Sequence, residues 1–190
     1  NRLIPFIGAG FSQNIEGYPG WDAFVEQLHE KSELDFKKFR KNNLEASEYF
    51  IWKKVEELIK EGKVKESNRN SDNGFLKGKD ELLKIIREMV ENIKRTDKNN
   101  GEWALHDLLV SKFDYIYTTN WDNTLELAKP KSKKKIIPIY KKSQFSNLDN
   151  NSDEIKIIKL HGHYKNIRAE SLIVCQKDYN KRIMEDNPFD

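Results

Sequence analysis

The sequence predicts an α/β fold, namely a Rossmann-like parallel sheet with a helical insertion between its first two strands. Short apolar segments, which are typical of buried strands, alternate with longer segments in which apolar residues recur at helical spacing. Such alternation is typical of parallel sheets, whose neighbouring strands are joined by helical crossovers. Several helical segments separate the first two predicted strands, more than one crossover needs. We therefore expect a helical insertion at about residues 40–100.

Five segments are predicted to be strands. The first, residues 3–7, is apolar and stops at the glycine turn Gly8-Ala9-Gly10. The second, residues 113–118, is rich in aromatic and β-branched residues, which favour strands. Three further apolar segments complete the prediction, at residues 136–140, 155–160 and 172–174.

Four segments have the apolar period of helices, at residues 21–28, 44–61, 80–94 and 103–112. Asp80 is the predicted N-cap of the third of these helices. The polar segment 63–79, rich in Lys, Asn, Ser and Gly, is predicted to be a long loop, and residues 96–101 a second loop.

The composition is polar but compatible with a packed core. Apolar residues make up 37% of the chain, charged residues 34%, and the mean hydropathy is −0.84. Four Trp, ten Phe and seven Tyr are nevertheless enough to build a core, so disorder throughout is excluded. The net charge of +3 arises from 34 basic and 31 acidic residues, a surplus too small to indicate nucleic-acid binding.

The single cysteine, Cys175, excludes an internal disulfide and a cysteine-based zinc module. A lone cysteine suits a reducing compartment, so we expect a cytoplasmic protein. No apolar segment approaches the ~18–20 residues that span a bilayer, so no membrane partner is expected. The chain starts at Asn1 without a Met, which favours a piece of a longer protein.

Three polar motifs each follow a predicted strand, at the edge of a parallel sheet where ligands bind. The first is Gly8-Ala9-Gly10-Phe11-Ser12. Its glycines let the backbone approach a phosphate, and N–H groups at a helix start favour an anion. An ordinary turn between strand and helix explains this segment equally well, because the full dinucleotide-binding spacing is absent.

The second motif is Thr118-Thr119-Asn120-Trp121-Asp122. An amide and a carboxylate two residues apart can reach ribose hydroxyls or position a water molecule. Alternatively, these side chains cap the first turn of a following helix, an interpretation that stays open for Asp122.

The third motif is Lys159-Leu160-His161-Gly162-His163. A histidine titrates near neutral pH, so His161 can act as a general base or acid. It can equally be a hydrogen-bonded core histidine. His163 has no specific predicted role, and the two histidines with Asn120 and Asp122 do not make a convincing metal site.

Together, these motifs resemble the SIR2 (sirtuin) superfamily, in particular the SIR2-like NAD-hydrolase domains of bacterial antiphage defence proteins. The family pattern of Gly-Ala-Gly-x-Ser, Thr-x-Asn-x-Asp and Leu-His-Gly is found in this order at residues 8–12, 118–122 and 160–162. Residues 17–21 resemble the Gly-x-Pro-x-Trp turn of the defence branch, and residues 173–179 the strand and Asp-Tyr turn that follow the histidine. Two features of the family are missing: the paired Cys-x-x-Cys motifs of zinc-containing deacylases, and a Gly-rich adenosine-side motif expected after Asp190.

The resemblance implies an NAD⁺ glycohydrolase that cleaves the nicotinamide–ribose bond and depletes NAD⁺ in abortive antiphage defence. It implies catalytic roles for Asn120 and His161, diphosphate contacts around Ser12, and a ribose near Asp122. The full set of implied NAD⁺ contacts is Gly8, Ala9, Gly10, Phe11, Ser12, Thr119, Asn120, Asp122 and His161. No metal is required.

Residues 1–190 are then one SIR2-like NAD-binding catalytic domain, truncated from a longer protein. The resemblance also implies a homo-oligomer, and a phage-protein or nucleic-acid trigger sensed elsewhere in the longer protein. Two alternatives remain. An NAD-dependent protein deacylase is disfavoured by the single cysteine, and a non-catalytic NAD or ADP-ribose sensor is disfavoured by the presence of Asn120 and His161.

Overall fold

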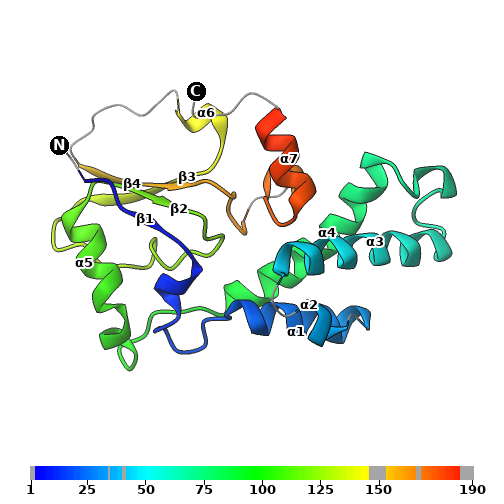
Figure 1. Cartoon of the computed structure of the whole chain (residues 1–190). Helices are drawn as coiled ribbons and strands as arrows, with labels where there is room; N and C mark the ends of the chain where they lie inside the picture. Colours follow the sequence, from blue (N-terminus) through cyan, green and yellow to red (C-terminus); the bar gives the residue numbers. More distant parts are fainter. Residues whose placement is uncertain (1–2, 34, 40–41, 146–152, 166–167, 185–190) are drawn as a thin grey trace. The chain divides into compact units, whose positions relative to one another are not determined.

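The computed structural model describes residues 3–33, 35–39, 42–145, 153–165 and 168–184 (Figure 1). The chain folds into two compact units, each formed by segments distant in sequence. The first unit comprises Asn1–Gly20 and Val90–Tyr164, and the second comprises Trp21–Met89 and Lys165–Asp190.

The first unit contains a four-stranded, all-parallel sheet. Its strands are β1 (Phe6–Ile7), β2 (Tyr115–Thr118), β3 (Lys135–Ile139) and β4 (Glu154–Lys159). They lie side by side in the order β1-β2-β4-β3 (Figure 1). The predicted Rossmann-like α/β class is therefore confirmed. β1 is shorter than predicted, although the Pro5 carbonyl just before it still accepts a hydrogen bond from the Tyr117 amide at 3.0 Å.

Apolar side chains of β2 and β4 form the core of the first unit with the helix that precedes β2. That helix, α5 (Ala104–Lys112), continues the 3-10 helix η3 (Asn100–Trp103). A further 3-10 helix, η1 (Ala9–Ser12), follows β1, and the short helix α6 (Lys142–Phe145) follows β3. One buried cluster of this core consists of Val110, Ile116, Leu125, Ala128, Ile155 and Ile157.

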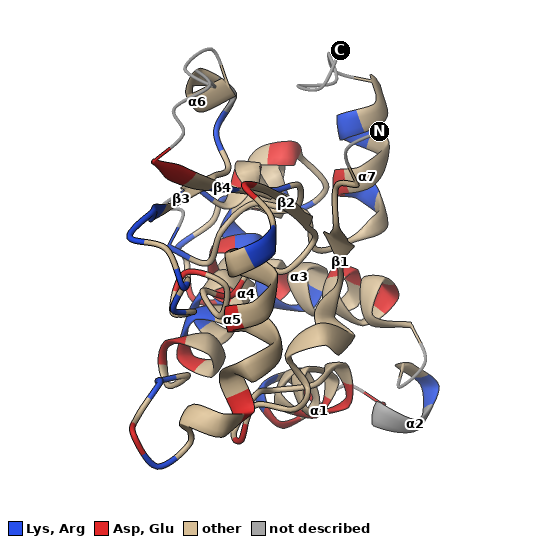
Figure 2. Ribbon diagram, turned by 90° about the vertical axis from the view of Figure 1, so that its left-hand side faces the viewer, with Lys and Arg blue, Asp and Glu red and all other residues tan. Residues whose placement is uncertain are grey.

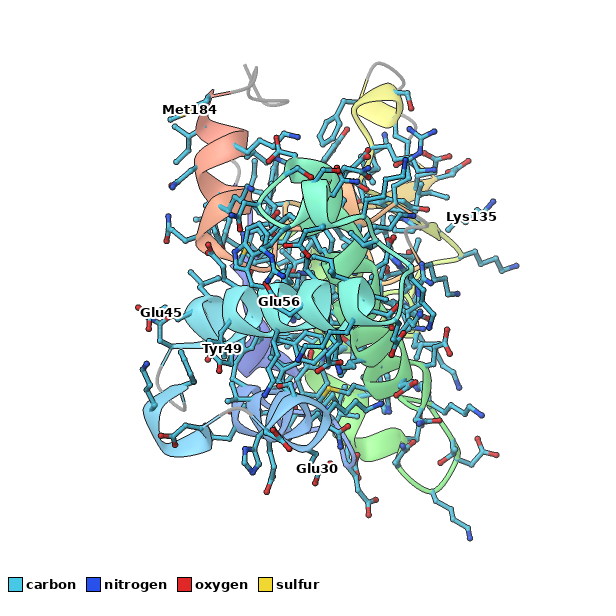
Figure 3. The ribbon with its side chains drawn as sticks, turned by 90° about the vertical axis from the view of Figure 1, so that its right-hand side faces the viewer. Glu30, Glu45, Tyr49, Glu56, Lys135 and Met184 are labelled. Carbon is cyan, nitrogen blue, oxygen red and sulfur yellow. The ribbon has the colours of Figure 1, made fainter. Side chains whose placement is uncertain are left out.

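The second unit is helical. Its main helices are α1 (Trp21–Ser32), α2 (Phe36–Phe39), α3 (Asn43–Lys60), α4 (Asp72–Glu91, which ends in the first unit) and α7 (Gln176–Met184). Two 3-10 helices are η2 (Glu66–Asn68) and η4 (Ala169–Ser171). Glu45 and Tyr49 project outward from α3 (Figure 3), whereas Phe50 is buried. Within the described part of the chain, no helix is both long enough and apolar enough to cross a membrane.

The start of α4 differs from the prediction. The helix begins at Asp72, so residues 72–79 are not a loop and Asp80 is an interior residue, not an N-cap. Tertiary packing explains the difference, because Phe75 and Lys79 are buried despite the polar sequence around them. Gly78, which indicated a loop, instead permits close packing: a Cβ there would collide with the carbonyl oxygen of Ile51 on α3.

The predicted strand at residues 172–174 is also wrong. The segment is buried but has no strand structure. Side chains satisfy its backbone: the amides of Val174 and Cys175 donate to Asp178 Oδ2 at 2.9 and 3.2 Å, and Lys79 Nζ donates to the Leu172 carbonyl at 2.5 Å. Apolar residues that indicated a strand therefore belong to a buried irregular segment. The other predicted strands and helices are confirmed within a few residues.

Candidate functional site at the strand ends

The three polar motifs lie at the carboxyl ends of three adjacent strands, and these strands end at the same level of the sheet. Ile7 is paired with Thr118, and Thr118 with Lys159, so the last residues of β1, β2 and β4 are in register. Hydrogen bonds continue past the strands, from the Thr119 amide to the Ile7 carbonyl at 3.2 Å and from the Leu160 amide to the Thr118 carbonyl at 2.8 Å. The carboxyl edge of the sheet thus brings the glycine turn, the Asn-x-Asp segment and the histidine segment together.

The glycine turn of the first motif is open on its outer side. Gly8 and Gly10 are exposed, and a Cβ at Gly10 would meet nothing within 4 Å. At Gly8, a Cβ would lie 3.7 Å from Thr119 Oγ1, an ordinary contact distance. A ligand can therefore approach the backbone of this turn closely while it also reaches the second motif.

Ser12, by contrast, points into the protein. The residue is 0% exposed. Its hydroxyl lies 3.2 Å from His106 Nε2 and 3.0 Å from Thr124 Oγ1. Any contribution of Ser12 to diphosphate binding must come from its backbone or from the position it gives the turn, and that role stays a prediction.

Asp122 organises the loop after β2. Its Oδ2 accepts a hydrogen bond from the Tyr18 hydroxyl at 2.9 Å. Its Oδ1 accepts from the amide and the hydroxyl of Thr124, at 2.9 and 2.6 Å. Asp122 therefore stabilises a local turn, but the helix that the capping interpretation predicted is absent, because residues 124–127 form a turn. A contact of Asp122 with a ribose stays a prediction.

These contacts form one directed chain of hydrogen bonds. Because Thr124 donates its only hydroxyl proton to the Asp122 carboxylate, Ser12 must donate to Thr124, and His106 Nε2–H must donate to Ser12. His106 Nδ1 is then unprotonated, and it is buried without a hydrogen-bond partner among the described residues. Thr124, which neither motif contains, connects Ser12 of the first motif to Asp122 of the second, and His106 extends the chain of hydrogen bonds beyond Ser12.

The pKa values agree with this assignment of protons. Burial, partly offset by the charge of Asp122, lowers the pKa of His106 from 6.5 to about 4, so its imidazole is neutral at physiological pH. Burial and the adjacent Asp122 carboxylate raise the pKa of Tyr18 far above its ordinary value, so it remains a phenol that donates. Phe11 and Trp103 pack against the His106 ring, with centroid distances of 4.7 and 5.6 Å.

Asn120 carries an unsatisfied polar atom within this site. It is 8% exposed, and its backbone N–H donates to Thr118 Oγ1 at 3.0 Å. Its side-chain Oδ1 is buried and has no hydrogen-bond partner among the described residues. Buried polar atoms are nearly always paired, so an unpaired one indicates a place for a bound water or ligand group. Asn120 thus fits its predicted role of orienting a substrate hydroxyl or a water molecule.

His161 follows β4 at a sharp turn and is partly exposed. Gly162 makes this turn with a φ of 86°, a conformation that favours glycine, as the sequence indicated. His163 differs in that it is buried between Tyr164 and Tyr140, with centroid distances of 4.9 and 5.1 Å, and its Nε2 lies 3.1 Å from Glu126 Oε1. Of these two histidines, His161 is the more exposed.

No individual role was predicted from the sequence for several residues of this region, namely Tyr18, His106, Lys159, and Thr124 and Glu126 in the polar cluster that follows the second motif. Tyr18 lies in the turn at residues 17–21, and Lys159 interrupts an apolar strand, so each carried a signal. His106 carried none, because a histidine on a helix says nothing of its distant partners. No group of three or more His, Cys, Asp or Glu that could hold a metal is found among the described residues.

Two other features concern the reactivity of the cysteine and the distribution of basic residues. Cys175, in the second unit, is buried, and burial and the charge of Asp178 raise its pKa to about 12, so it stays a thiol and is not an activated nucleophile. The lysine-rich segment 129–135 enters β3 at its amino end, opposite the edge that carries the motifs (Figure 2). Lys135 projects into solvent (Figure 3).

Comparison with known families gives a match in the carboxy-terminal part of the chain. Residues 114–190 match the family model described as SIR2-like domain. The matched segment contains β2, β3, β4 and α7, and with them the second and third motifs, while the glycine turn precedes it. The resemblance predicted from the motifs is confirmed over these residues. A search of curated proteins finds no match to the chain.

Proposed function

We propose, on the premise that residues 114–190 are SIR2-like, that this protein is an NAD⁺ glycohydrolase that cleaves the nicotinamide–ribose bond. The family match supports an NAD-related function. The main structural observation behind the proposal is the buried Asn120 Oδ1, which has no hydrogen-bond partner among the described residues. Asn120 follows β2, and His161 follows the neighbouring strand β4.

The reaction needs orientation and one proton acceptor. When the bond between the ribose C1 and nicotinamide breaks, nicotinamide leaves with the electron pair and the ribose becomes oxocarbenium-like. A water oxygen then bonds to C1 and loses a proton, giving ADP-ribose. Asn120 Oδ1 would accept a hydrogen bond from this water or from a ribose hydroxyl, and His161 would take the proton. No step requires a metal.

The glycine turn would hold the diphosphate. Gly8, Ala9, Gly10 and Phe11 present backbone rather than charged side chains, and the open side at Gly10 supports close approach of a ligand. Thr119, beside Gly8, would contact the same end of the substrate. Ser12 and Asp122, whose side chains are bonded inside the protein, would act by holding the turn and the loop in place.

The biological setting follows the resemblance. We propose that the activity depletes NAD⁺ in abortive antiphage defence, in the cytoplasm and as a homo-oligomer. Its trigger, a phage protein or a nucleic acid, would be sensed elsewhere in a longer protein. These proposals rest on the likeness of the motifs to the defence branch of the family.

The test is nicotinamide release from NAD⁺, measured by chromatography. Asn120→Ala and His161→Ala should each lower the rate by roughly 10²-fold or more, the usual scale for a positioned acid–base group. Asn180→Ala and His29→Ala are matched controls, because both residues are exposed and lie on helices of the second unit. Circular dichroism should show that all four variants fold. A wild-type rate in either site variant, or an inactive wild-type protein, would contradict the proposal.

A further inference from the structure

Lys159 is a buried cation at the end of β4. Its side chain is 1% exposed, although lysine is rarely buried without a reason. Transferring an ammonium group out of water is costly, and a well-packed apolar residue in its place is often no less stable. The position of Lys159 therefore calls for an explanation beyond stability.

Among the described residues, the Lys159 ammonium contacts the segment that follows β2. Nζ donates to the backbone carbonyls of Asn120, at 3.4 Å, and of Asp122. It also forms an ion pair with Glu126, at 3.2 Å from Oε1. One side chain from β4 thus holds the backbone on both sides of Trp121.

Glu126 supplies the counter-charge. Burial alone would raise the pKa of its carboxyl, but the charge of Lys159 and the hydrogen bond from His163 hold that pKa below its ordinary value. Glu126 is therefore a carboxylate at neutral pH, and His163 Nε2 must donate to it, at 3.1 Å. Together with the two backbone carbonyls, the Glu126 carboxylate supplies an acceptor for each of the three donors of Lys159.

We propose that Lys159 is a positioning residue that fixes the backbone of Asn120 relative to His161. It stands two residues before His161 on the chain and bonds directly to the Asn120 carbonyl, so a single side chain connects the two proposed catalytic residues. A displacement of about 1 Å at a reacting group can cost about 10²-fold in rate, so this connection affects turnover more than substrate binding. The inference rests on the proposed function.

The test separates positioning from charge balance. Lys159→Met leaves Glu126 buried without its cation and should destabilise the fold. Lys159→Met combined with Glu126→Gln removes both charges and should recover much of the melting temperature. If Lys159 positions the loop, the double variant still lacks the donors to the two carbonyls, and its kcat should stay about 10²-fold below wild type with little change in KM. Lys159→Arg restores cationic N–H donors and should raise kcat roughly tenfold above the double variant.

A second measurement does not depend on turnover. In protein labelled with 5-fluorotryptophan, the ¹⁹F resonance of Trp121 should shift in the double variant, while those of Trp52 and Trp103 should not. Lys156→Met is the matched control, because Lys156 is an equally buried lysine of β4, beside Glu154 and over the Tyr115 ring. It should alter neither kcat nor the Trp121 resonance.

Each outcome decides the proposal. A wild-type kcat in the double variant, an unshifted Trp121 resonance, or a Lys159→Arg variant no better than the double variant would overturn it. So would a Lys156→Met variant that behaves like the double variant. If the wild-type protein releases no nicotinamide, the proposed function fails, and the Trp121 resonance alone then decides whether Lys159 positions the loop.

Discussion

Replacing Ser12 with alanine breaks the buried hydrogen-bond chain at its middle. His106 Nε2–H loses its acceptor, and it stays out of water because Ser12 and His106 are both 0% exposed. A buried donor left unpaired costs about 1–3 kcal/mol, and the lost hydrogen bond to Thr124 adds about 0.5–1.5 kcal/mol. We therefore expect Ser12→Ala to lower the free energy of unfolding by roughly 1.5–4.5 kcal/mol.

Ser47→Ala is the matched control for this substitution. It deletes the same atom at a position that is also 0% exposed, on helix α3. The Ser47 hydroxyl has no hydrogen-bond partner among the described residues, so its removal relieves an unsatisfied polar group and introduces a better helix former. The free energy of unfolding should stay the same or rise by about 0.5 kcal/mol.

The assay is urea unfolding of both variants, followed by circular dichroism. The two variants should differ in their free energy of unfolding because the two hydroxyls are equally buried but differ in their hydrogen-bond partners. Equal losses, or an undiminished stability in Ser12→Ala, would refute the assignment of the chain from His106 to Asp122.

Three further predictions concern titration, substrate and packing. The pKa of His106 is lowered from 6.5 to about 4, so between these values the unfolded chain binds more protons than the folded protein, and stability should fall as the pH is lowered through this window. Long-range ¹H–¹⁵N NMR should show the Nε2–H tautomer, and an ordinary histidine midpoint would contradict the assignment. Nicotinamide release should be the same with or without an acetylated peptide and with or without a chelator, since one cysteine cannot build the zinc module; peptide-dependent release would favour the deacylase. Gly78→Ala should lower the free energy of unfolding by about 1–3 kcal/mol, because its Cβ would collide with the Ile51 carbonyl. Gly101→Ala, with open space around it, should not lower it. Equal melting temperatures of the two variants would refute the close packing of α3 and α4.

The sheet could be predicted because its strands are short apolar segments bounded by turn residues. β2, β3 and β4 were each found within two residues of their bounds. The grouping of the three motifs then follows from topology, since the carboxyl ends of parallel strands share one edge. Local sequence was sufficient here because burial and secondary structure coincide in these strands.

The prediction of secondary structure failed where the apolar pattern of the sequence does not correspond to the secondary structure that forms. Residues 172–174 are buried without being a strand, because Asp178 and Lys79 satisfy their backbone groups. The first two turns of α4 are helical despite a polar sequence, because Phe75 and Lys79 are buried by tertiary packing. Partners of Lys79 lie more than ninety residues away along the chain, and no local pattern reveals such a distant contact.

The candidate site shows the same division between local and distant information. Asn120 and His161 could be proposed from the sequence because each belongs to a short motif at a strand end. Their supporting residues were not found, because His106 reaches Ser12 across 94 positions and Lys159 reaches Asp122 across 37. A motif records which residues a ligand meets, whereas the residues that hold the motif rigid can come from anywhere in the chain.

The loop from Asn120 to Asp122 is held from two directions by separate polar clusters. Tyr18 and Thr124 bind the Asp122 side chain, while Lys159 binds the backbone carbonyls on either side of Trp121. The buried Asn120 Oδ1 has no hydrogen-bond partner among the described residues, and the same holds for Asn123 Oδ1 and Glu126 Oε2 just beyond this loop. Leaving a buried acceptor unpaired lowers the stability of the fold by about 1–3 kcal/mol. Other contacts of the network can offset this loss, but the acceptor itself gains a hydrogen bond only when a water or ligand binds. Because Asn120 follows a strand end at the edge of the sheet and its loop is held by these contacts, its unpaired Oδ1 is preorganised for a donor from outside the protein, and we propose a ribose hydroxyl or an attacking water as that donor.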